Sequence, residues 1–133
     1  MTQEDKELLL KDLSARLPHG IKFPMMCWDE ETGETLRPVT LYSISKDGYC
    51  QVLEDDYSPY IDESKPYLFP TSSMTEEQTQ ELESLMEIIT IPAWGEILSP
   101  TPEYYDFLNK NHFDYRGLID KGLAIDATGL NIY

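Results

Sequence analysis

The residue types that most often carry catalytic chemistry are scarce in this chain and lie far apart. It contains two histidines, His19 and His112, and two cysteines, Cys27 and Cys50. A cysteine nucleophile needs a histidine beside it in space, and no local pattern brings these residues together. A zinc site needs more such ligands at closer spacing, for example a C-x-x-C pair, which is absent. No catalytic or metal-ligating residue is therefore predicted.

Motifs for nucleotides, acyl transfer and calcium are absent as well. The sequence holds no Walker motif, no G-x-G-x-x-G and no G-x-S-x-G. Its consecutive acids Glu54, Asp55 and Asp56 cannot surround one calcium ion as the spaced ligands of an EF-hand loop do. Acidic residues are so abundant that no pair stands out as a general acid and base. These observations predict a protein that is not an enzyme and binds no cofactor.

One segment has residue types that recognise a partner's surface. Tyrosines alternate with prolines between residues 57 and 70, including Tyr57, Tyr60 and Tyr67. Tyrosine supplies rigid contact area at low entropic cost, so these rings are candidates for an interaction surface. The alternative is that they pack over a sheet, with their phenol oxygens reaching water.

The closing block HFDYRGLIDK holds the densest mixture of functional groups. His112 follows a predicted helix, where a cation suits the helix dipole. Arg116 lies near Asp114 and Asp120, which predicts a local structural ion pair; an acidic group on a partner is the alternative. We count His112, Tyr115 and Arg116 among the candidate interaction residues. If the block lines a pocket, it could instead serve a small-molecule binder or an enzyme.

The elements that position these residues begin with a helix over Gln3 to Leu17. Thr2 and Asp5 have the spacing of a capping box, and leucines recur on one side of the helix. A second helix is predicted to start after Thr75, with an apolar stripe that continues toward Pro92. The stripe consists of Leu82, Leu85, Met86 and Ile89.

Two further helices are predicted near the C-terminal end. One follows Thr101, with Pro102 at its first position, and runs to about Asn111. The other is a short helix that Asp114 caps and Gly122 closes in the left-handed conformation.

Strands are predicted mainly between residues 21 and 53. The run from Ile21 to Trp28 is apolar, and Pro24 restricts it to a sheet edge or bulge. A hairpin over Val39 to Leu53 is predicted to turn at Asp47-Gly48, through a two-residue turn of the primed type. Beyond it we expect a packed, extended connection with a short strand near residues 67–69, and a terminal strand in the tail. The prediction is an α+β fold and a single domain over residues 1–133, with a small antiparallel sheet of about three to four strands. An N-terminal helix and two to three C-terminal helices pack with this sheet.

The net charge of the chain limits the classes of partner that it can bind. Ten basic and twenty-five acidic residues give a net charge of −15, spread evenly over both halves. No basic stripe exists to release counterions from a phosphate backbone, and the field repels anionic membranes. We therefore expect neither nucleic acid nor a membrane as a direct partner.

The sequence also carries signals about its compartment. The N-terminus has no basic region followed by an apolar run, and no stretch approaches the ~20 apolar residues of a membrane span. Two cysteines are too few for a secreted disulfide framework and are predicted to be reduced core thiols. These features predict a cytoplasmic protein.

Three segments together resemble a known group of proteins. The opening DKELLLKDLSARLPHGIK, the central KPYLFPTSSMTEEQ and the closing NHFDYRGLIDKGLAIDA are similar to small uncharacterised proteins of gut Bacteroides and their phages or mobile elements. The resemblance covers about half of the chain, and residues 23–64 depart from it more freely. It implies a bacterial, cytoplasmic setting and a domain of unknown function, and it assigns no catalytic residue.

Three functional hypotheses remain. The first is a non-enzymatic interaction module with a protein partner. The second is an acidic decoy that mimics nucleic acid and occupies a basic site on another protein. The third is a small-molecule binder or enzyme that uses His112, Tyr115 and neighbouring acids. The sequence leaves the oligomeric state open.

Overall fold

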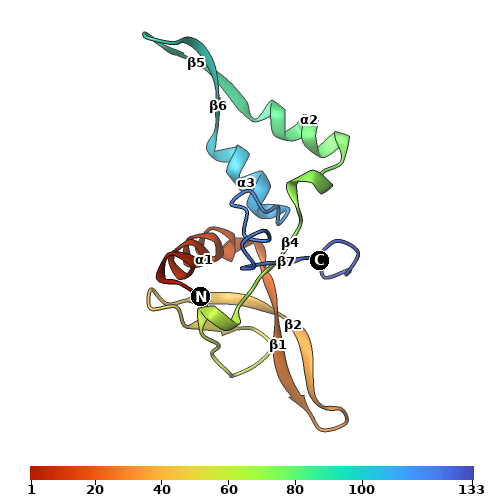
Figure 1. Ribbon diagram of the computed structural model, residues 1–133. Helices are drawn as coiled ribbons and strands as arrows, with labels where there is room; N and C mark the ends of the chain where they lie inside the picture. Colours follow the sequence, from red (N-terminus) through yellow and green to blue (C-terminus); the bar gives the residue numbers. More distant parts are fainter.

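The computed structural model describes all 133 residues, and Figure 1 shows a body from which a long arm projects. The fold is α+β, as predicted, with three α-helices and a three-stranded antiparallel sheet. The arm comprises residues 76–110, and the body comprises the remainder. In chain order the elements are α1 (Gln3–Arg16), η1 (Leu17–His19), β1 (Lys22–Asp29), β2 (Gly33–Ile44), β3 (Cys50–Val52), η2 (Ile61–Glu63), β4 (Tyr67–Leu68), η3 (Thr71–Ser73), α2 (Glu76–Ser84), β5 (Met86–Ile91), β6 (Gly95–Pro100), α3 (Pro102–Lys110) and β7 (Ile125–Asp126).

The predicted caps start the helices where the sequence indicates. Thr2 and Asp5 form the capping box of α1, and Thr75 and Gln78 form that of α2. Each box satisfies two backbone N–H groups that have no partner within the helix. Pro102 occupies the first turn of α3, where its missing N–H has no consequence.

The main sheet has the strand order β1-β2-β3 and is antiparallel throughout. Pro24 lies in β1, an edge strand, as the sequence predicts. The predicted two-residue primed turn at Asp47-Gly48 is wrong, because Ser45 pairs with Tyr49 and the loop spans three residues, 46–48. Gly48 alone among them has a positive φ, +94°, a conformation that favours glycine. A β-carbon there would meet the Tyr60 ring at 3.0 Å, so this turn also needs glycine for space.

The main core lies between α1, the sheet and the C-terminal segment. Leu9 and Leu13 of α1 pack with apolar side chains of all three sheet strands and with Leu118 and Leu123. Both cysteines are buried and unbonded, which confirms the prediction of core thiols. The strands β4 and β7 form a separate parallel pair, so the predicted short strand and terminal strand bond to each other.

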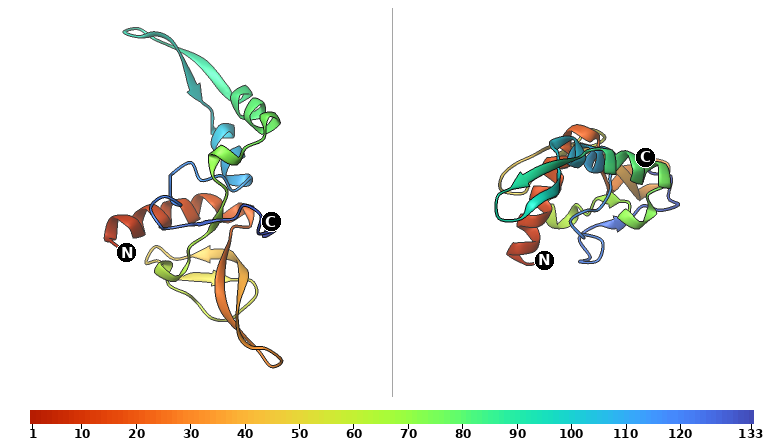
Figure 2. Two further views of the ribbon diagram at one scale, coloured as in Figure 1. Left: turned by 45° about the vertical axis from the view of Figure 1, so that its right-hand side comes forward. Right: turned by 90° about the horizontal axis from the view of Figure 1, so that it is seen from above.

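The arm corrects the predicted second helix. α2 ends at Ser84, and the stripe residues Met86 and Ile89 lie in β5, which pairs with β6 as an antiparallel hairpin. The run Glu87–Ile91 is rich in β-branched residues, which lose side-chain freedom in a helix and suit a strand. The left view of Figure 2 shows this hairpin extending away from the body, with α2 and α3 at its base.

The predicted short helix after Asp114 is also wrong. The segment from Tyr115 to Gly122 consists of turns, although Asp114 does accept backbone hydrogen bonds from Leu118 and Ile119 as a cap would. Gly122 has a φ of +71°, the left-handed conformation expected of it. None of the helices combines the length and apolar character that crossing a membrane requires.

Candidate interaction site

The β5–β6 hairpin carries an apolar cross-strand pair on each face. Ile88 pairs with Leu98 on one face, and Ile89 pairs with Ile97 on the other. Side chains alternate between the faces of a strand, so a hairpin that covers a core normally pairs an apolar face with a polar one. Here each face is mixed, because the Thr90–Glu96 pair lies beside Ile88 and Leu98 and the Glu87–Ser99 pair lies beside Ile89 and Ile97.

The large side chains of the hairpin lie in solvent. Ile88 is 67% exposed, Leu98 is 65% exposed, and Trp94 at the tip is 79% exposed. Outside the hairpin, its main contacts are with α2 and α3 at the base of the arm. A two-stranded hairpin is marginally stable alone in water, and clustered exposed apolar side chains mark interaction sites.

The outer edge of β5 presents free backbone groups. The N–H of Thr101 donates to the carbonyl of Leu85 at 3.3 Å, and the register of β5 and β6 is continuous from that point. Backbone bonds alternate along an antiparallel pair, so Met86, Ile88 and Thr90 direct their N–H and C=O groups away from β6. Unlike β1 with Pro24 and β6 with Pro100, β5 contains no proline to block an added strand.

The arm carries a large share of the negative charge. Residues 76–110 contain eight acidic residues and one lysine, a net charge of −7. Four glutamates of α2, namely Glu76, Glu77, Glu81 and Glu83, are exposed. The apolar hairpin is therefore attached to an acidic helix.

The structure separates the three candidate tyrosines of residues 57–70. Tyr57 is exposed, and its hydroxyl donates to Glu63 at 3.1 Å, which raises the pKa of the phenol. Tyr60 is half-buried and packs edge-on against Tyr49, with ring centroids 5.1 Å apart. Tyr67 is buried in β4.

His112 is buried where α3 returns to the body. Its φ is +62°, its carbonyl accepts the N–H of Phe69, and its ring stacks on Tyr133 with centroids 3.7 Å apart. Burial lowers the pKa of His112 to about 4, and the nearby guanidinium of Arg16 adds to this effect. The prediction of a cation at the helix end is therefore wrong, because burial keeps the imidazole neutral. The Nδ1 atom has no hydrogen-bond partner.

Arg116 forms an ion pair, but its partner is not local. It donates to Asp12 of α1 at 2.7 Å, and Asp12 also accepts a bond from Arg16 at 2.9 Å. The Tyr115 ring lies beside both guanidinium groups, 5.4 Å from that of Arg16 and 4.5 Å from that of Arg116. The predicted pairing with Asp114 or Asp120 is replaced because the fold brings α1 against this block.

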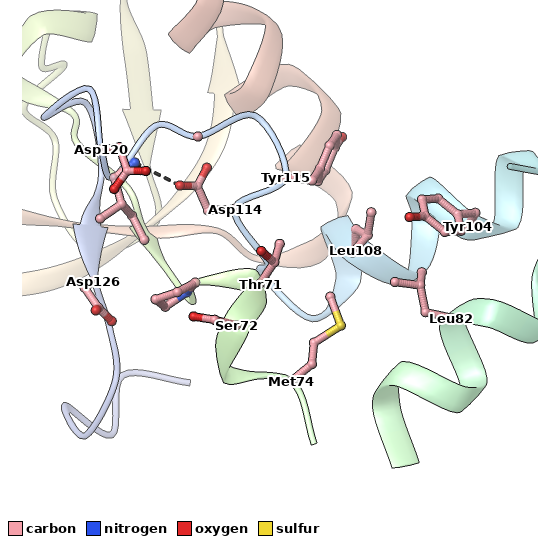
Figure 3. A pocket seen from close by; sticks show the side chains of 13 residues that line it. Thr71, Ser72, Met74, Leu82, Tyr104, Leu108, Asp114, Tyr115, Asp120 and Asp126 are labelled. Atoms are coloured by element: carbon pink, nitrogen blue, oxygen red, sulfur yellow. Dashed lines mark hydrogen bonds between the residues drawn. The ribbon is translucent and has the colours of Figure 1, made fainter. Parts of the chain in front are cut away.

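A cavity of about 660 Å³ lies where the arm meets the body, as Figure 3 shows. Met74, Leu82 and Leu108 line it together with Asp120, Asp126 and the edge of Tyr115. Asp114 also borders the cavity, but both of its carboxylate oxygens accept backbone N–H groups. His112 borders a different cavity, of about 440 Å³. The C-terminal block therefore does not gather its histidine, tyrosine and acids in one pocket.

The structure does not bring the six sequence-predicted residues to one surface. It instead reveals the β5–β6 hairpin, whose signals in the sequence are the β-branched run after Glu87 and the Trp94-Gly95 pair that turns it. No group of three or more His, Cys, Asp or Glu side chains is arranged to hold a metal ion. Comparisons with protein-family models, curated proteins and solved structures find no match to this chain.

Proposed function

We propose that this chain is a non-enzymatic interaction module, of bacterial or phage origin, that binds a protein partner through the β5–β6 hairpin. The observation that carries the proposal is the exposure of Ile88, Trp94 and Leu98 on a hairpin with an apolar pair on each face. Burying one such side chain contributes about 1.5–3 kcal/mol, so a partner that covers all three gains several kcal/mol. Aromatic residues of this kind often dominate binding at an interface centre.

The residues of the C-terminal block support a structural role for that block. Arg116 bonds to Asp12, and the Tyr115 hydroxyl donates to Asn109 at 2.9 Å. Asp114 is occupied by two backbone N–H groups. These contacts hold α1, α3 and the C-terminal turns together, and they position the base of the arm.

A pair of matched tryptophans tests the proposal. Trp94 lies at the tip of the arm hairpin, and Trp28 lies on the β1–β2 hairpin at the other end of the molecule, 73% exposed. Each is replaced in turn by the photoreactive residue p-benzoylphenylalanine, and the full chain is irradiated in lysate from a gut Bacteroides host.

We expect one dominant protein adduct from position 94 and none of the same mass from position 28. An Ile88→Ser/Leu98→Ser change in the position-94 protein should abolish that adduct, because it removes apolar area without touching the core. The same adducts from both positions, or none from position 94, would refute the proposed role of the hairpin.

The exposed glutamates of α2 favour the acidic decoy as a second candidate. A helix that presents Glu76, Glu77, Glu81 and Glu83 offers the regular negative charge that a basic nucleic-acid site attracts. The test is retention of the lysate's heparin-binding proteins on the immobilised chain at rising salt. The decoy predicts binding that weakens steeply with salt and is lost when the four glutamates become glutamine. Binding that persists after these substitutions would exclude it.

A further inference from the structure

We propose that the partner of the β5 edge is a second copy of this chain, which adds its own β5 antiparallel across a two-fold axis at Ile88. This inference rests on the proposed role of the hairpin and names its occupant. The product is a continuous four-stranded sheet in the order β6-β5-β5-β6. Isologous pairing of identical strands is a common way to close a symmetric dimer.

The register follows from the direction of the free backbone groups. Met86, Ile88 and Thr90 point their N–H and C=O groups outward, because β6 occupies the groups of the residues between them. With the axis at Ile88, Ile88 lies opposite its own copy and Met86 lies opposite Thr90. Each of these opposed pairs exchanges two hydrogen bonds. An axis at Ile89 would align Met86 with Pro92, which has no N–H to donate and lies in the turn.

The side chains agree with this register. In each copy Ile88 pairs with Leu98, so the axis at Ile88 creates a row Leu98–Ile88–Ile88–Leu98 across the four strands. Cross-strand neighbours of this kind stabilise a sheet by about 0.2–1 kcal/mol per pair. The row joins the two most exposed aliphatic side chains of the hairpin with their counterparts.

The negative charge of the chain limits how tightly two copies bind. On the opposite face Glu87 lies across from Ile89, so no two carboxylates are directly opposed, but the two Glu87 residues are diagonal neighbours about 7–8 Å apart. The pairing also brings together two arms that each carry a net charge of −7, so this repulsion opposes the dimer and salt screens it. Strand pairing over the five residues 86–90 of each copy lies at the small end of interface areas, so the expected Kd is about micromolar.

The test uses sedimentation equilibrium of the full chain between about 1 and 500 µM. We expect a reversible monomer–dimer equilibrium in the wild type. Ile88→Lys places two lysines in direct opposition and should leave a monomer at every concentration. Leu98→Lys is the matched control, since Leu98 has nearly the same exposure on the same face but lies one strand away from the axis. It should change the Kd by less than about tenfold.

The effects of salt and of Glu87 on the dimer Kd distinguish self-pairing from binding to another protein. Raising the salt from about 50 to 500 mM and substituting Glu87→Gln should each tighten the dimer several-fold, because both relieve the diagonal repulsion. Ile88→Cys should form a disulfide-linked dimer under mild oxidation, whereas Leu98→Cys should not.

Three results would contradict the proposal that a second copy of the chain pairs with β5. They are a wild type that stays monomeric throughout, equal losses in Ile88→Lys and Leu98→Lys, and self-association that salt weakens. A monomeric wild type that still forms the position-94 adduct with another protein would retain the interaction module and remove only the dimer. Loss of both the dimer and the adduct would remove both proposals.

Discussion

Asp12 and Arg16 form an ion pair that is completely buried, one helical turn apart on α1. Asp12 also accepts a bond from Arg116, and Arg16 donates to the carbonyl of Phe113, so residues from both ends of the chain meet at this pair. Removing one member of a buried pair leaves an uncompensated charge, which typically costs about 3–5 kcal/mol. We therefore expect Asp12→Ala to lower the free energy of unfolding by about that amount in urea denaturation.

The surface pair between Arg37 and Asp29 is the control for this prediction. Its atoms are 2.7 Å apart, similar to the buried bonds, but both side chains are partly exposed. Exposed pairs contribute about 0–1 kcal/mol, so Asp29→Ala should cost less than about 1 kcal/mol. Equal losses for Asp12→Ala and Asp29→Ala would show that burial does not set the importance of the α1 pair.

His112 makes the free energy of unfolding depend on pH in the mildly acidic range. Its pKa is about 4 in the folded chain and 6.5 in the unfolded chain, because burial opposes the charged imidazolium. Between these values the unfolded chain binds more protons, so the contribution is intact above about pH 6.5 and is lost as pH falls toward 4. Lowering the pH from 7 to 5 should therefore remove about 2 kcal/mol of stability through this residue alone.

The variant His112→Asn isolates that contribution. Asparagine tolerates the positive φ of this position and does not titrate, so the loss of stability between pH 7 and 5 should shrink by about 2 kcal/mol. His19→Asn should retain most of the loss, because it keeps His112 and removes only one of the smaller causes of that residue's lowered pKa. Urea unfolding at several pH values measures both variants. An unchanged pH dependence in His112→Asn would contradict a buried, neutral imidazole.

At the scale of elements, local signals were sufficient for the starts of the three α-helices and for the strands β2 and β3. The pairs Thr2–Asp5 and Thr75–Gln78 predict two capping boxes, and both form. A cap depends only on residues a few positions apart, which makes it readable from the sequence. The Asp47-Gly48 pair is a local signal of the same kind: the chain reverses there and the flanking strands form, although the loop has three residues instead of two.

Two parts of the fold could not be read in this way. Leu82, Leu85, Met86 and Ile89 have helical spacing, yet the chain leaves the helix at Ser84 and continues as β5. A prediction from helical spacing alone ignores the strand preference of the β-branched run. It also ignores the pairing with β6, which joins Leu85 to Thr101, sixteen residues away. The partner of Arg116 lies 104 positions away, and no local pattern identifies such a contact. The candidate site depends on both of these non-local features.

The β5–β6 hairpin should be the least protected sheet in the molecule. It has two strands and no core beneath it, whereas Phe23 and Val39 of the main sheet are fully buried. In hydrogen exchange at micromolar concentration, we expect its amides to exchange at least about tenfold faster than those of Phe23 and Val39. Equal protection in the two hairpins of a monomeric sample would contradict this prediction.

In the same hydrogen-exchange experiment, the outward-facing amides of β5 report on pairing with a second copy. The N–H groups of Ile88 and Thr90 have no partner within one chain, so they should exchange freely when the protein is dilute. Pairing with a second copy should slow both of them as the concentration rises. The N–H of Leu41, which bonds to Ile21 at 3.0 Å within the body, should not depend on concentration.

At the scale of the whole molecule, the excess of negative charge opposes folding at low ionic strength. The folded chain holds a net charge of −15 in a compact volume, and self-repulsion of this kind destabilises a compact state. Of its three ion pairs, two involve the fully buried Asp12, where salt screens little. Added sodium chloride should therefore weaken repulsion more than attraction.

We expect the melting temperature to rise by a few degrees between about 20 and 300 mM sodium chloride, equivalent to roughly 1 kcal/mol. The melting temperature is measured at a protein concentration where sedimentation shows only monomer. Dimerisation strengthened by salt then does not raise the melting temperature. The four glutamates of α2 supply the control, because replacing Glu76, Glu77, Glu81 and Glu83 with glutamine removes charge from an exposed surface. This variant should melt higher at low salt and gain less from added salt. A melting temperature that falls with salt would show that attractive pairs, rather than the net charge, dominate the electrostatics of this fold.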